Sequence, residues 1–71
     1  MTVNLDSRCV VRLMAEKAMT TAALSRTIGM KPQNLGQIIK RGTCSHINAS
    51  RIASALGVAF DVVTSSEDAH V

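Results

Sequence analysis

The stretch that decides the fold of this chain is residues 21–40, TAALSRTIGMKPQNLGQIIK. Its apolar residues fall at helical spacing on both sides of Gly29, and the four expected to be buried are Leu24, Ile28, Leu35 and Ile38. Ser25 is small at the point where two helices would cross. The pattern predicts a helix, a tight turn and a second helix.

Gly29 stands at the predicted corner. A chain that leaves one helix and enters another within about three or four residues usually needs a left-handed residue at the end of the first helix. Glycine adopts that conformation without a steric penalty. Pro32 falls where the first turn of a helix tolerates proline, because the N–H that proline lacks has no helical partner there. We therefore expect one helix to end at Gly29 and the next to begin at Pro32.

The second of these helices is expected to present a polar, amide-rich and basic face. Leu35 and Ile38 turn inward, with Ile39 beside them. The residues left to point away from the core are Gln33, Asn34, Gln37, Lys40 and Arg41. Gly36 weakens the helix by about 1 kcal/mol relative to alanine, and its missing side chain would allow close approach of another helix or of a backbone.

Polar residues and glycines mark where four helices would begin and end. The first is expected from about Asp6 to Ala18, and the third from about Pro32 to Lys40. The expected N-caps are Asp6 or Ser7 for the first helix, Thr20 for the second, and Ser45 or Asn48 for the fourth. The glycines expected to end the second, third and fourth helices are Gly29, Gly42 and Gly57.

The segment that follows the fourth helix, residues 58–64, is short and β-branched, and we expect a strand there. A lone strand has no partner within the chain, so it would pair with the same strand of a second copy and form a two-fold dimer. The alternative is a short helix that begins after Ala59 and packs Phe60 and Val63 onto the core. Periodicity alone does not separate the two.

Length and composition limit the rest. A chain of 71 residues makes one small domain, which buries only about 60% of its unfolded surface. Phe60 is the only aromatic residue, so the core must be aliphatic, and such a core often gains stability from a second subunit. We predict a single domain at 1–64, built around a helix-turn-helix at 20–42, and a polar, frayed tail at 65–71.

Several function classes are disfavoured. Cys44 and His46 are near each other, but a zinc site needs three or four ligands, and Cys9 and His70 are distant in sequence. The acidic residues lie near the two ends and no glycine-rich phosphate loop occurs, so we expect neither an enzyme nor a cofactor. No signal peptide or membrane-length apolar run is recognised, and the widely spaced cysteines fit a reducing cytoplasm.

Charge is distributed unevenly along the chain. From Lys17 to Phe60 there is no acidic residue, and the basic ones are Lys17, Arg26, Lys31, Lys40, Arg41 and Arg51. The segment from Asp61 onward reverses this, with three acidic residues and no Lys or Arg. A mixed, solvated surface is the ordinary alternative for a small domain. A long stretch of one sign is instead typical of a surface that binds phosphates.

Two segments together resemble the Cro and repressor type of helix-turn-helix regulator (XRE-like), found in phages, mobile elements and bacterial chromosomes. Residues 19–35, MTTAALSRTIGMKPQNL, resemble the family's second helix, turn and start of recognition helix, and residues 51–58, RIASALGV, resemble its fourth helix and end. The family typically has serine where Lys31 stands and often glutamine where Thr21 stands. The connection at residues 38–42 is long, which resembles the branch of this family whose domain ends in a β-strand. The resemblance implies a mainly α, four-helix domain whose C-terminal strand pairs across a dimer.

A recognition helix enters the major groove, about 12 Å wide, with its N-terminal residues nearest the bases. The expected base-reading residues are Gln33, Asn34 and Gln37, whose amides both donate and accept. The expected phosphate-binding residues are Thr21, Arg26, Lys31, Lys40, Arg41 and Thr43. Helix capping and turn polarity are an equal alternative for the threonines.

Two functions remain open at this point. The first is a small dimeric repressor that binds double-stranded DNA at a pseudo-palindromic operator. The second is an antitoxin-like or adaptor module that binds a protein partner and uses its helix-turn-helix only structurally. The basic helical face favours the first, whereas the acidic tail keeps the second open.

Overall fold

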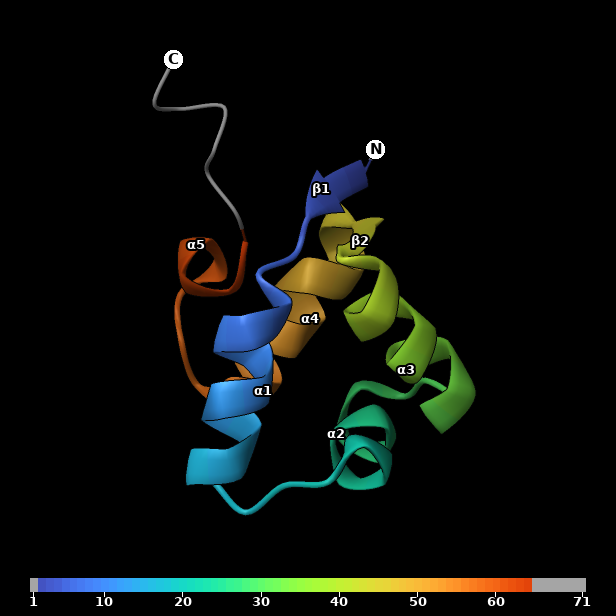
Figure 1. Cartoon of the computed structure of the whole chain (residues 1–71), viewed down its shortest axis with the longest axis vertical. Helices are drawn as coiled ribbons and strands as arrows, with labels where there is room; N and C mark the ends of the chain where they lie inside the picture. The colour runs from blue at the N-terminus through green and yellow to red at the C-terminus, as the bar shows by residue number, and fades with distance from the viewer. Residues whose placement is uncertain (1, 65–71) are drawn as a thin grey trace.

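The computed structural model describes residues 2–64, which form a mainly helical domain with one small sheet (Figure 1). The elements in chain order are β1 (Thr2–Asn4), α1 (Ser7–Glu16), α2 (Thr21–Ile28), α3 (Pro32–Arg41), β2 (Thr43–Ser45), α4 (His46–Leu56) and α5 (Phe60–Val63). The predicted mainly α class is confirmed. The frayed tail predicted at 65–71 lies outside the described residues.

Side-chain hydroxyl or carboxylate oxygens cap the N-termini of three helices. The N-caps of α1, α2 and α4 are Asp6, Thr20 and Ser45. Each side-chain oxygen accepts a hydrogen bond from the backbone N–H three residues further on, at 3.2, 3.1 and 3.1 Å respectively. Each bond satisfies one of the N–H groups that a helix leaves without an internal partner. These caps are among those predicted from the sequence.

An aliphatic core holds the helices together. Its fully buried larger side chains come from every helix, and they are Val10, Leu24, Leu35, Ile52, Leu56 and Val63. Phe60, the single aromatic residue, is only partly buried at its edge. The core is therefore aliphatic, as the composition predicted.

The strand expected at residues 58–64 is wrong, because residues 60–63 form the short helix α5. Val63 is fully buried, and Phe60, one helical turn earlier, packs against the same core. Burying both side chains on one side requires helical spacing, and this outweighs the β preference of the local sequence. The short-helix alternative is correct, and the dimer-forming strand has no counterpart in the fold.

The sheet was not expected from the sequence. β1 and β2 are antiparallel, with Thr2 opposite Ser45 and Asn4 opposite Thr43. The segment after β1 continues these long-range contacts, since the Leu5 N–H donates to the Gly42 carbonyl at 2.8 Å. Residues 2–5 therefore connect the end of α3 and β2 to the rest of the domain.

Candidate nucleic-acid interface

The turn between α2 and α3 has the geometry that the sequence predicted. Gly29 ends α2 in the left-handed conformation, with φ 74° and ψ 35°. The Gly29 N–H donates to the Arg26 carbonyl at 3.3 Å, and the Met30 N–H donates to the Ser25 carbonyl at 2.8 Å. This pair of bonds closes the helix end. α3 then begins at Pro32, two residues after Met30.

Buried side chains fix α3 against α2 and the core. Leu35 and Ile38 are buried on the inner side of α3, and Leu24 and Ile28 are buried on α2. Ser25 is 1% exposed, and its hydroxyl donates to the Ala22 carbonyl at 2.8 Å, so this small polar residue is satisfied within its own helix. α3 is therefore held by one side and free on the other.

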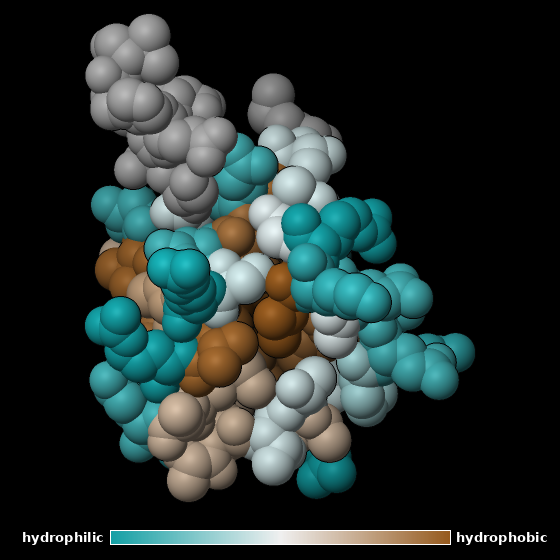
Figure 2. Space-filling model, viewed as in Figure 1, coloured by the Kyte–Doolittle hydropathy of each residue, from teal (hydrophilic) through white to brown (hydrophobic). Residues whose placement is uncertain are grey.

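The free side of α3 carries the predicted polar residues. The side chains exposed along it are Gln33, Asn34, Gln37, Lys40 and Arg41. Figure 2 shows hydrophilic side chains gathered along its right edge, over the position of α3 in Figure 1. We call these five residues the α3 face. Three of its residues carry amides, and the other two are cations at the C-terminal end.

The predicted phosphate-binding cations fall into two groups at the ends of α3. Arg26 and Lys31 line one surface hollow at the α2–α3 turn. Lys40 and Arg41 line a second hollow with Gln37. The cations therefore lie in two pairs at opposite ends of α3, and the amides of Gln33 and Asn34 lie between the pairs.

The two threonines predicted to bind phosphate are placed differently. Thr21 is half-buried at the first residue of α2, and Thr43 is half-buried in β2. Neither lines the two hollows that the cations form. Thr43 also pairs with Asn4 through the sheet, a position that the sequence did not predict.

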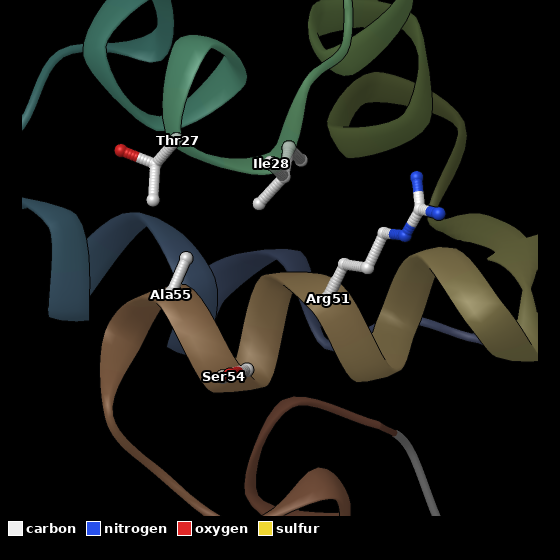
Figure 3. Close-up of a pocket in the computed structure, with 5 residues that line it drawn as sticks. All are labelled: Thr27, Ile28, Arg51, Ser54 and Ala55. Carbon is white, nitrogen blue, oxygen red and sulfur yellow. The ribbon is translucent and has the colours of Figure 1, made fainter.

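Arg51 is a cation to which the sequence assigned no role. It is exposed on α4 and lines a hollow with residues from the end of α2 and from α4. In Figure 3, Thr27 and Ile28 lie above α4, and the Arg51 side chain rises from α4 on the same side. The sequence signal that could have pointed to Arg51 is its place in the stretch from Lys17 to Phe60, which contains no acidic residue.

Acidic residues are absent from α2, α3 and α4. Those within residues 2–64 are Asp6, Glu16 and Asp61, at the two ends of α1 and in α5. The α3 face and its cation pairs therefore have no carboxylate on their own helices, which favours an anionic partner.

Cys44 and His46, the residues considered for metal binding, lie in environments unlike a metal site. Cys44 is buried in β2, and burial raises the pKa of its thiol. The His46 ring stacks on Phe60, with ring centroids 4.5 Å apart. Within residues 2–64, no group of three or more His, Cys, Asp or Glu side chains is placed to hold a metal ion.

Comparisons with known proteins do not indicate what the α3 face binds. The chain matched no family model, no curated protein and no solved structure. In the part of the chain that the structure describes, no helix has both the length and the apolar character needed to cross a membrane. What the α3 face binds is therefore inferred from its geometry and charge.

Proposed function

We propose that this chain is a sequence-specific regulator that binds double-stranded DNA, with α2, the turn and α3 acting as a helix-turn-helix of the Cro and repressor type. The observation that carries the proposal is the α3 face: amides at the start and middle of an anchored helix, with cations at its end. In this proposal, α3 is the recognition helix.

The dimensions of α3 support this assignment. Its 10 residues span about 15 Å, and a helix with its side chains is about 10–12 Å across, which matches the major groove. Gln33 and Asn34 lie in the first turn of α3, which is the part of a recognition helix nearest the base edges, and Gln37 follows one helical turn after Gln33. An Asn or Gln amide binds adenine through two hydrogen bonds, so these three residues are the proposed base readers.

The proposed phosphate contacts come from both ends of α3. Arg26 and Lys31 would contact the backbone on the side of the turn, and Lys40 and Arg41 on the opposite side. Such contacts position a protein on the duplex without reading its sequence. Thr21 and Thr43 remain proposed hydroxyl or N–H contacts.

A homodimer is part of the proposal, because proteins of this motif commonly bind two half-sites one helical turn apart. The small aliphatic core favours a second subunit as well. Three large apolar side chains stay exposed among the described residues: Val11, Ile47 and Val62. Val62 belongs to α5, so residues 58–64 would contribute to a dimer as a helix and not as a strand.

A salt titration with duplex DNA tests the proposal. The logarithm of the binding constant should fall linearly with the logarithm of the salt concentration, with a slope of about −0.9 for each phosphate contacted. Four cation contacts per subunit would give a slope of about −3.6 per subunit. DNA binding that does not depend on salt concentration, or the absence of DNA binding, would favour the protein-interaction alternative.

Selection of bound fragments from random duplex DNA tests sequence specificity and symmetry together. We expect recovery of an inverted repeat with half-site centres about 34–36 Å apart. Recovery of unrelated sequences would contradict base reading by the α3 face. A single, unrepeated half-site would contradict the dimer but leave the DNA-binding proposal in place.

A further inference from the structure

Gly36 lies in the middle of α3, where nothing inside the described part of the chain requires a glycine. Its φ is not positive, unlike that of Gly29, Gly42 and Gly57. Apart from its chain neighbours and the backbone of its own helix, a Cβ at this position would meet no heavy atom within 4 Å. The close helix approach that the sequence left open is therefore not made within this fold.

Glycine is nevertheless a poor choice for the interior of a helix. Among the amino acids, only proline is a worse helix former, and alanine is the best. Because alanine fits at position 36 without strain or clash, the glycine weakens α3 without improving its packing. A contact with a partner outside the chain would explain why this position has no side chain.

The place of Gly36 on α3 indicates which partner that is. Gln33 lies three residues before it and Lys40 four residues after it, so the three are neighbours on the helix surface. The buried residues of α3, Leu35 and Ile38, point elsewhere. Gly36 therefore leaves the α3 main chain uncovered between a proposed base reader, Gln33, and a proposed phosphate contact, Lys40.

We propose that Gly36 lets the sugar-phosphate backbone of bound duplex DNA lie directly against the α3 main chain, beside Lys40. This inference rests on the proposed function and adds a contact that it does not contain. A methyl group at position 36 would hold the strand away from the helix. It would also pull the Gln33 amide back from the bases and Lys40 from its phosphate. Because every duplex has the same backbone, the effect should be felt by all sequences.

The substitutions Gly36→Ala and Gly36→Leu test this contact. Gly36→Ala should raise Tm by several degrees, because alanine favours the helix and the space is open. At fixed salt, it should lower the affinity for DNA at least tenfold, both for a selected duplex and for one of unrelated sequence. Gly36→Leu should stay folded by circular dichroism and lower the affinity further.

Ser50→Ala is the matched control. Like Gly36→Ala, it replaces a weaker helix former with alanine, but Ser50 is exposed on α4 and not on α3. It should leave DNA affinity unchanged. If the unmodified chain binds DNA and Gly36→Ala binds equally well, this inference is wrong and the proposed function stands. If Gly36→Ala is less stable than the unmodified chain, Gly36 has a role within the fold and the inference is also wrong. If the unmodified chain binds no DNA, both fail.

Discussion

Asn34 and Lys40 are both exposed on α3, but their side chains support different kinds of contact. Asn34→Ala should reduce discrimination between the selected duplex and a duplex with one changed base pair by about 1–3 kcal/mol. Its affinity for unrelated DNA should stay nearly constant. Lys40→Ala should weaken binding to all duplexes alike and reduce the salt slope by about one unit. Competition binding at several salt concentrations measures both effects, and identical behaviour of the two variants would contradict the assigned roles.

Cys44 gives a prediction about pH. Burial raises the pKa of its thiol above the ordinary value of 9.0, because the thiolate is poorly solvated in β2. The unfolded chain therefore loses this proton at a lower pH than the folded chain does. The thiol's contribution to stability is constant below about pH 9 and decreases as pH rises above that value.

The difference between the unmodified chain and Cys44→Ala isolates the contribution of the Cys44 thiol. Urea unfolding at about pH 8 and about pH 10 should show a larger loss of unfolding free energy for the unmodified chain. An equal loss in both proteins would show that the Cys44 thiol does not titrate differently on folding.

Gly29 and Gly36 are seven positions apart, yet the same substitution should have opposite effects at the two sites. Gly29 ends α2 at φ 74°, a conformation that costs an ordinary residue about 1–2 kcal/mol. Gly36 has helical geometry and open space, so alanine should stabilise α3 by about 1 kcal/mol. A shift of about 4–8 °C in Tm per kcal/mol makes both effects measurable by thermal unfolding. Shifts of the same sign would contradict this account of the turn.

The helices α1 to α4 could be predicted closely because their signals are local. Thr20 and Ser45 cap helices through bonds to residues three positions away, and Gly29 supplies a conformation that few other residues adopt. These features depend on neighbours in sequence. The α3 face followed from the same spacing, since fixing Leu35 and Ile38 inward also fixes which residues face outward.

The strands and α5 could not be predicted in this way, because distant contacts decide them. Val3 pairs with Cys44 across most of the chain, and three-residue strands carry little periodicity of their own. In α5, the β-branched sequence favoured a strand, but the burial of Phe60 and Val63 selected a helix. The pairing of Arg26 with Lys31 in one hollow likewise needed the angle of the turn.

The N-terminal segment connects parts of the molecule that are far apart in sequence. The Leu5 N–H donates to the Gly42 carbonyl after α3, and Leu5 forms a bridge with Thr64 after α5. The Ser7 hydroxyl donates to the Ile39 carbonyl at 2.6 Å, in the last turn of α3 where carbonyls lack helical partners. The C-terminal end of the α3 face is therefore held from outside α3.

Leu5→Ala should show how much the domain depends on this connection. The Leu5 side chain is 5% exposed, and truncating a buried leucine costs about 2–5 kcal/mol. A domain of this size has a total stability of roughly 4–11 kcal/mol, so the loss is a large fraction of the whole. Arg12→Ala is the control, because Arg12 is exposed on α1 and its truncation should change stability by about 0.5 kcal/mol or less. Urea unfolding compares the two, and equal losses would mean that Leu5 does not join the N-terminal segment to the core.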